Sequence, residues 1–261
     1  MTVIDQMNRE VTIPEKVNRI VSLVPSQSEF LWEMGLSDKL VGISKFCIHP
    51  DEMYRNTMRV GGTKQINIET IKELNPDLII GNKEENVKEQ IEELEKIFQV
   101  WMSDINNLDD AFAMMNSLSE ILNFESDKKN QLIKIEEDLN SVKGIFNGLK
   151  VVYLIWHDPV MAVGNGTFIN SVLEYVGLEN ALKNESRYPE LTNKKLEKLD
   201  IDVCMLSSEP FPFNDSHLKY YSESFSNFSP RLVDGEMFSW YGTRLAHLPS
   251  YVKQLKKVWN D

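Results

Sequence analysis

The stretch Ser126–Gly148, SDKKNQLIKIEEDLNSVKGIFNG, decides how the rest of the chain is organised. Its apolar residues recur at spacings of three and four, which is one face of a helix: Leu132, Ile135, Leu139, Val142 and Phe146. Ser126 can cap its start and Gly148 can end it, so the pattern predicts a helix over 126–148, roughly 30 Å long. We interpret it as a strut between two lobes; the alternative is an ordinary amphipathic helix packed on one sheet.

The segments on either side of this stretch resemble each other. In both, short β-rich runs alternate with helical patterns, which predicts an α/β fold with doubly wound parallel sheets. The best internal match pairs Asn67–Ile80 with Thr192–Met205, 125 positions later. The predicted organisation is therefore an N-terminal lobe over 1–125, a connecting helix over 126–148 and a C-terminal lobe over 149–261. A chance match of two helix–strand units is the alternative. Only the polar, aromatic region that ends at Pro230 has no clear period.

The composition narrows the classes of partner. A net charge of -12 argues against nucleic acid and against an anionic membrane surface. Cys47 and Cys204 are too few for a disulfide framework. The first residues, MTVIDQMNREVTIP, lack the basic start and apolar run of a secretory signal. We therefore expect either a cytoplasmic protein or a mature form that carries an added Met.

Aromatic residues gather on the loops that follow the predicted strands. In doubly wound sheets ligands bind at the carboxyl ends of the strands, where these loops lie. The residues are Phe46, Trp156, Tyr188, Phe211, Phe213, Phe238, Trp240 and Tyr241. Such a set favours a cleft that holds a large, partly apolar ligand. The alternative is that several of them pack their loops onto the core.

Two histidines occupy comparable loops, His49 in one half and His157 in the other. A facing pair could ligate the metal of a corrin, haem or siderophore, whereas exposed loop residues would need no such role. His217 and His247 are isolated in the sequence and receive no role. GxSxG, GxxxxGK[ST] and HExxH are absent from the sequence, so no catalytic residue and no metal site is assigned beyond His49 and His157 as candidates.

Three segments carry a resemblance to a known family: DQMNREVTIPEKVNRIVSLVPSQSEFLWEMG (5–35), VGGTKQINIETIKELNPDLII (60–80) and DGEMFSWYGTR (234–244). They resemble the helical-backbone (class III) substrate-binding proteins of ABC importers. The resemblance is strongest to vitamin B12 (cobalamin) binding proteins, with siderophore and haem binders as cousins. It covers nearly the whole chain and implies two Rossmann-like lobes, joined by one backbone helix, with the ligand in the cleft between them.

The resemblance also implies a set of ligand-binding residues. Carried over to this sequence, they are Phe46, His49, Thr63, Lys64, Asn82, Trp156, His157, Met161, Tyr188, Phe238, Trp240 and Tyr241. Thr63 and Asn82 stand where cobalamin binders use tryptophan, so the N-terminal wall is more polar here. Trp156 and Trp240 could compensate for that difference.

Family members dock on their permease through one surface glutamate per lobe, which meets arginines of the transporter. Glu69 matches the first glutamate, whereas the second falls on Lys194. Glu190 and Glu197 are close enough in sequence to substitute for it. The resemblance therefore implies partner docking through Glu69, Glu190 and Glu197, and a periplasmic or cell-surface location.

These observations predict a monomeric, non-enzymatic binding protein. It would capture a corrinoid or related metal chelate for an importer and would carry no cofactor of its own. One alternative is a cytoplasmic ligand sensor on the same fold, and another is a chelatase-like metal-handling enzyme. The enzyme requires His49 or His157 to be essential. The binder requires Trp156→Ala and Trp240→Ala to weaken affinity.

Overall fold

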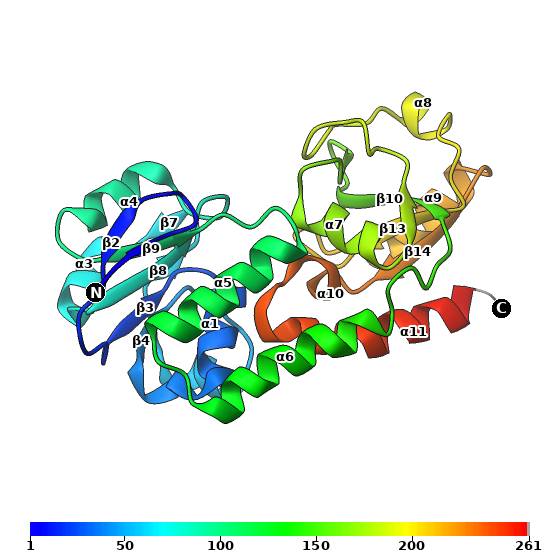
Figure 1. The fold of residues 1–261 in the computed structure, drawn as a ribbon. Coiled ribbons are helices and arrows are strands. Elements are labelled where there is room, and N and C mark those ends of the chain that lie inside the picture. The colour runs from blue at the N-terminus through cyan, green and yellow to red at the C-terminus, as the bar shows by residue number, and fades with distance from the viewer. Residues whose placement is uncertain (260–261) are drawn as a thin grey trace. The chain divides into compact units, whose positions relative to one another are not determined.

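The computed structural model describes residues 1–259, and the contacts divide the chain into two compact units. Unit 1 comprises 1–105, 109–135 and 240–244; unit 2 comprises 106–108, 136–239 and the residues from 245 onward. Each unit is built on its own sheet of mainly parallel strands, so the predicted α/β fold class is confirmed (Figure 1). No helix within 1–259 is long and apolar enough to cross a bilayer.

The sheet of unit 1 has five parallel strands in the order β5-β4-β3-β8-β9. Their bounds are Met58–Arg59, Leu40–Ile43, Ile20–Ser22, Leu78–Asn82 and Val100–Ser103. Ile20 of the central strand lies opposite Leu40 on one side and Leu78 on the other. The three central strands are almost entirely buried, as expected for a parallel sheet covered on both faces.

Helices cover both faces of this sheet. They are α1 (Pro25–Leu31), α2 (Asp51–Asn56), α3 (Ile68–Leu74), α4 (Lys88–Glu95) and α5 (Leu108–Ile121). The connections β3–α1–β4 and β8–α4–β9 run in opposite directions across the sheet, so right-handed crossovers place α1 and α4 on opposite faces. Figure 1 shows α3 beside α4 and α5 beside α1. Two hairpins complete the unit: β1 (Thr2–Ile4) with β2 (Glu10–Thr12), and β6 (Gly61–Gly62) with β7 (Gln65–Ile66).

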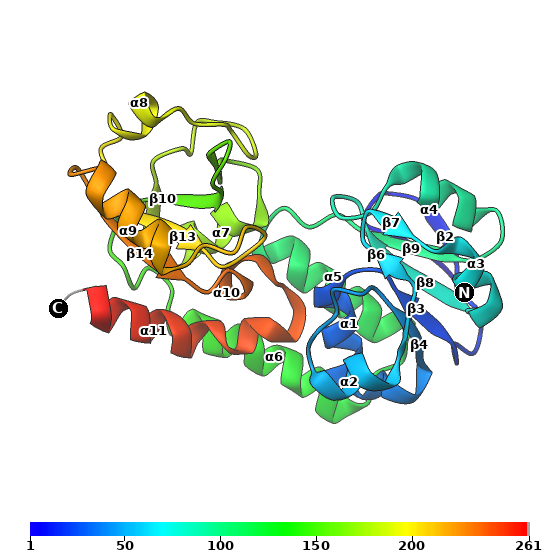
Figure 2. The same ribbon diagram turned by 180° about the vertical axis from the view of Figure 1, so that it is seen from behind.

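Unit 2 has the strand order β11-β10-β13-β14, with β12 pairing the first half of β10. The strands are Met161–Ala162, Leu149–Trp156, Val203–Ser207, Ser229–Val233 and Leu178–Asn180, and only β11 is antiparallel. The helices are α7 (Phe168–Tyr175), α8 (Asn193–Leu196), α9 (Asp215–Ser224), α10 (Glu236–Ser239) and α11 (Leu248–Trp259). Figure 2 shows α9 packed beside β14. The sequence predicted no helix at α9.

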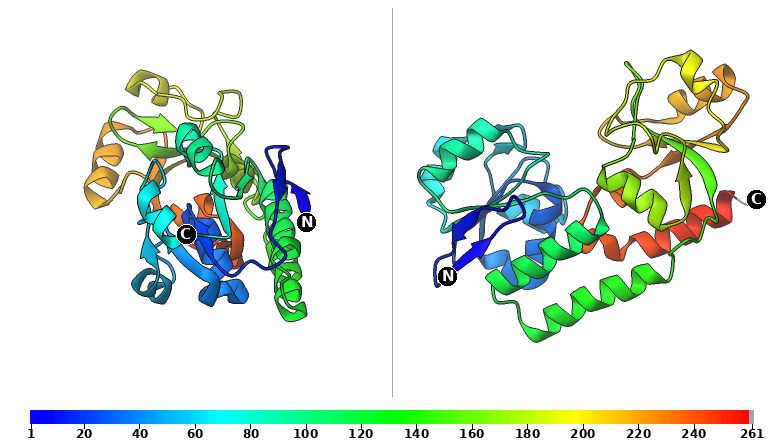
Figure 3. Two further views of the ribbon diagram at one scale, coloured as in Figure 1. Left: turned by 90° about the vertical axis from the view of Figure 1, so that its left-hand side faces the viewer. Right: turned by 45° about the horizontal axis from the view of Figure 1, so that its top comes forward.

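The predicted strut is shorter than its apolar spacing indicated. Helix α6 spans Ser126–Asn140, the long green helix of Figure 3. The contact-based boundary between the units falls inside it, after residue 135. Residues 141–148 form turns, with φ of 68° at Gly144, 53° at Asn147 and 84° at Gly148. A right-handed helix cannot contain these left-handed residues, so the predicted end at Gly148 is wrong.

Candidate functional site

A buried polar network shapes the carboxyl edge of the sheet in unit 1. The Asn82 side chain donates to Ser103 Oγ at 2.9 Å, and its carbonyl accepts the backbone N–H groups of residues 84 and 85. Gln27 Nε2 donates to Ser103 Oγ at 2.7 Å, and Asn86 Nδ2 donates to the carbonyl of Thr63 at 3.1 Å. Asn82 is only 2% exposed, so the network uses it to hold the loops. Its predicted role in ligand binding stays a prediction.

The neighbouring loops of unit 1 carry the more accessible predicted residues. Phe46 is 50% exposed, and Lys45 Nζ lies 5.1 Å from its ring centre. Lys64 is also exposed, and its amino group donates to the backbone carbonyl of Glu84. Thr63 and His49 are half-buried. These loops therefore present an aromatic ring beside the Lys45 cation, and a further exposed lysine at 64, in a chain that is acidic overall.

The segment 240–244 belongs to unit 1 although its neighbours in sequence belong to unit 2. Arg244 donates twice to Glu29 of α1, at 3.0 Å from Nε and 2.5 Å from Nη2, and both side chains are at most 10% exposed. The guanidinium lies 5.0 Å from the ring centre of Trp240, and the ring centres of Trp240 and His49 are 5.7 Å apart. Burial raises the pKa of Glu29, although the Arg244 charge lowers it. The structure thus brings His49 and Trp240 together on unit 1.

Tyr241 also attaches segment 240–244 to the rest of unit 1. Its backbone N–H donates to Ser26 Oγ at 3.3 Å, and its hydroxyl lies 3.4 Å from a carboxylate oxygen of Glu85. Burial raises its pKa well above the usual value, so the phenol stays protonated and donates. Trp240 and Tyr241 are 8% and 4% exposed, respectively.

In unit 2 the predicted residues divide between the surface and the core. Trp156 is 39% exposed at the end of β10, and its ring packs edge-on against Phe211 at 5.5 Å. Met161 and Tyr188 are half-buried, and Arg187 lies 5.6 Å from the Tyr188 ring centre. By contrast, Phe238 is fully buried against Tyr153. A ligand could reach Trp156 without any rearrangement, whereas Phe238 supports the loop from below.

His157 lies in a cluster that the sequence did not predict. Its ring is within 6.2 Å, centre to centre, of five other rings, and we call this set the histidine–aromatic cluster: His157, Phe211, Phe213, His217, Tyr220 and Tyr221. His217 joins it because α9 starts at Asp215 and turns this residue toward the loop after β10. The missed signal is Asn214-Asp-Ser-His217, in which Asn214 caps α9 and His217 completes a capping box.

The candidate docking residues are on the surface. The Glu69 side chain is 77% exposed in the first turn of α3, where it pairs with Lys72 at 2.7 Å. Glu190 and Glu197 are exposed on either side of α8, the helix that contains Lys194. All three carboxylates are accessible to a partner, and their role stays a prediction.

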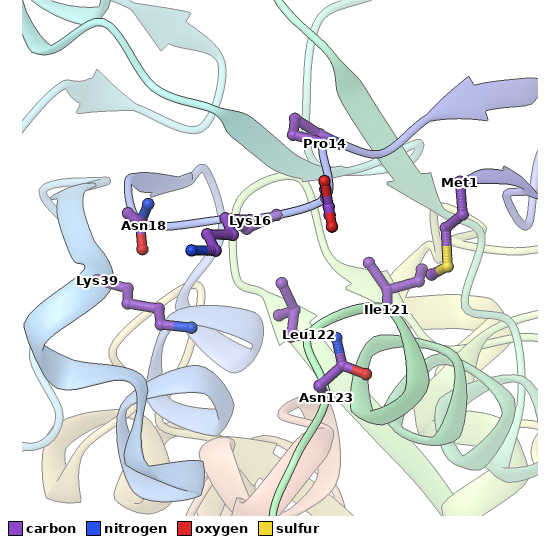
Figure 4. A pocket seen from close by; sticks show the side chains of 10 residues that line it. Met1, Pro14, Lys16, Asn18, Lys39, Ile121, Leu122 and Asn123 are labelled. Carbon is purple, nitrogen blue, oxygen red and sulfur yellow. The ribbon is translucent and has the colours of Figure 1, made fainter.

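Each unit contains a cavity within its described residues. One of about 420 Å³ lies in unit 1, where Figure 4 shows Lys16 and Lys39 on one side and Met1 and Ile121 on the other. None of the predicted ligand-binding residues lines it. A second, of about 720 Å³, is lined in unit 2 by His157, with Tyr220 beside it. Residues 1–259 contain no group of three or more His, Cys, Asp and Glu that could hold a metal ion.

A family model described as "Periplasmic binding protein" matches residues 20–224. An ABC transporter substrate-binding lipoprotein of Bacillus subtilis, YvrC, is 26% identical over 217 residues, which are 78% of this chain and 68% of that protein. A vitamin B12-binding protein of Vibrio parahaemolyticus is 26% identical over 198 residues, 74% of this chain and 72% of that protein.

Solved structures share the fold at lower identity. The periplasmic haem-binding protein RhuT from Roseiflexus superposes with a TM-score of 0.79 at 17% identity, over 94% of this chain and all of its own. The catecholate-siderophore binding protein VctP from Vibrio cholerae gives 0.78 at 14%, over 97% and 99%. These similarities show that the chain shares the fold of these proteins over 94% and 97% of its length.

Proposed function

The chain belongs to the periplasmic binding protein family, and we propose that it is the substrate-binding protein of an ABC importer for a corrinoid or a related metal chelate. The related proteins named above bind substrates rather than transform them, and among them are a vitamin B12 binder, a haem binder and a siderophore binder. We propose no enzymatic activity. The protein would work outside the cytoplasm, as a lipoprotein relative does, and deliver its ligand to a permease.

The observation that carries this proposal is the exposure of large aromatic side chains on carboxyl-end loops. Phe46 of unit 1 is 50% exposed and Trp156 of unit 2 is 39% exposed, although both would be expected to pack away from water. Rings of this size at strand ends suit a broad, flat, partly apolar ligand such as a macrocyclic or catecholate chelate. Lys45 beside Phe46 would add affinity for anionic groups on such a ligand.

Fluorescence quenching tests the proposal, with cobalamin, haemin and a ferric catecholate titrated into the protein in parallel. We expect saturable one-to-one binding of at least one of the three. Trp156→Ala should weaken that binding by about tenfold, because the loss of an aromatic contact costs about 1–2 kcal/mol. Trp259→Phe is the matched control, since Trp259 packs on Phe146 in unit 2 and lies on none of the predicted loops. Absence of binding to all three, or equal affinity in both variants, would contradict the proposal.

Docking can be tested separately. We expect Glu69→Arg to weaken association with the cognate permease in liposomes, because it reverses the charge that would meet an arginine. Glu190→Arg and Glu197→Arg test which carboxylate replaces the one missing at Lys194. Glu73→Arg, on the same helix, is the control for a general change in net charge.

A further inference from the structure

The cavity of about 420 Å³ in unit 1 lies away from the predicted ligand-binding residues. Part of its lining is the segment 14–18, which leads into β3, and Lys39 lies directly before β4. Because β3 and β4 are parallel, the cavity is at the amino ends of these strands. The loops proposed to bind a chelate follow the carboxyl ends, so the cavity is separate from that site.

Two lysines bring positive charge to this cavity. Lys39 is half-buried and Lys16 is exposed, and neither amino group donates to another residue within 1–259. Figure 4 shows both side chains on the same side of the cavity. Glu15 is the one acidic residue among the described residues of the lining, so the two lysines leave it net positive in a chain of net charge -12. Two ammonium groups without a partner at one cavity favour an anion.

The other side of the cavity is apolar. Ile121 and Leu122, from the end of α5, are buried, as is Val17. Figure 4 shows Ile121 and Leu122 across the cavity from Lys39. An anion that also has an apolar body would place that body against this wall and remove both surfaces from water.

Two asparagine amides complete the lining. Asn123 has φ of 55°, the left-handed conformation in which the chain leaves α5, and Asn18 lies beside the lysines in Figure 4. Neither side-chain amide is hydrogen-bonded within 1–259, so both can donate to a ligand. The described residues of the lining include no arginine and no helix N-terminus, the groups best suited to phosphate. A carboxylate, which carries a single charge, therefore fits better than a phosphate.

We propose that this cavity binds a small carboxylate with an apolar body, such as a medium-chain alkyl carboxylate. Lys16 and Lys39 would meet the carboxylate, and Leu122 would contact the apolar body. A cavity of about 420 Å³ is within the range of about 300–1,000 Å³ that small-molecule sites occupy. The site goes beyond the chelate-binding function proposed above, since none of the predicted chelate-binding residues lines it.

Calorimetry on the full chain tests the proposal with octanoate, octanol and acetate, which separate the charge of the ligand from its apolar body. We expect one-to-one binding of octanoate. Octanol, which has no charge, should bind at least about tenfold more weakly, and acetate, which has almost no apolar body, should show no measurable binding. The proposal would be overturned by absence of octanoate binding, or by octanol or acetate binding as tightly as octanoate.

Substitutions locate the octanoate on the molecule. Lys16→Gln and Lys39→Gln should each weaken its binding about fivefold, the effect of losing one partly exposed ion pair. Asn18→Trp should abolish binding, because it fills the cavity from an exposed position, and circular dichroism checks that this variant is folded. Lys129→Gln, an exposed lysine of α6 outside the cavity, is the matched control. Equal affinity in the wild type and the three cavity variants would overturn the proposal, as would loss of binding in Phe46→Ala instead.

Discussion

Glu29 and Arg244 form an ion pair that is almost wholly removed from water. Removal of one partner from such a pair leaves an uncompensated charge and costs about 3–5 kcal/mol. We therefore expect Arg244→Met to lower the free energy of unfolding by about 3 kcal/mol near neutral pH, measured by urea denaturation. Arg55→Met is the matched control, because Arg55 and Asp51 pair on the surface, and we expect less than about 0.5 kcal/mol there.

The pH dependence of this variant follows from the direction of the Glu29 shift. The pKa of Glu29 is raised in the folded protein. Its contribution to the free energy of unfolding is therefore complete below the pKa of the unfolded chain, about 4.3, and is lost as the pH rises through the pKa of the folded protein. Without Arg244 the folded pKa rises further. The deficit of Arg244→Met should thus shrink as the pH is lowered from 8 toward 5. A deficit that is constant with pH would mean that Glu29 is not the buried charge responsible.

The structure shows the surroundings of the predicted site residues, whose role in ligand binding stays a prediction. Phe46 and Trp156 are exposed on carboxyl-end loops, as strand ends and composition indicated. Asn82 ends strand β8 and Phe238 lies in α10, and both are buried, because a hydrogen-bond network holds Asn82 and Phe238 packs against Tyr153. The capping box at Asn214 and His217 is a local signal for the start of α9, but the proximity of His217 to His157 depends on tertiary structure.

At the scale of elements, two threonine caps offer a matched comparison. Thr167 Oγ1 caps α7 by accepting the N–H of Asn170 at 3.2 Å, and it also donates to the carbonyl of Gly164 at 3.0 Å in a buried site. Thr192 caps the four-residue helix α8 and is exposed. We expect Thr167→Ala to cost about 2 kcal/mol and Thr192→Ala about 0.5 kcal/mol in urea unfolding. Equal costs would mean that the buried bond to Gly164 contributes nothing.

Helices and strands that have a clear local sequence pattern could be predicted. Elements whose ends or positions depend on contacts with distant residues could not. The central strands are short apolar runs, and Thr167 caps the start of α7, so both elements have a local signal in the sequence. The apolar spacing of α6 continues to Phe146, which is indeed buried, but left-handed residues end the helix first. Helix α9 was missed because its aromatic residues belong to a side-chain cluster rather than to a clean amphipathic stripe.

At the scale of the whole molecule, the chain does not divide into two continuous pieces. The sequence predicted lobes over 1–125 and 149–261 with a connecting helix between them, whereas the contact-based division changes unit after residue 135, inside α6. They also assign 240–244 to unit 1, long after the chain has entered unit 2. No local sequence pattern predicts that 240–244 belongs to unit 1, since the contacts that attach it join residues far apart in sequence, such as Glu29 and Arg244, which are 215 positions apart.

Because segment 240–244 belongs to unit 1, a substitution in it should destabilise unit 1 rather than unit 2. Arg244→Met should speed amide hydrogen exchange in α1 and β8 of unit 1 much more than in β10 and β13, although Arg244 lies beyond all the strands of unit 2 in sequence. Leu206→Ala, in the buried core of unit 2, should do the opposite, with a cavity cost of about 2–5 kcal/mol. Mass spectrometry of peptides from each unit measures both effects in one experiment. If either variant raised exchange equally in both units, the chain would unfold as a single cooperative body and the division into two units would have no energetic meaning.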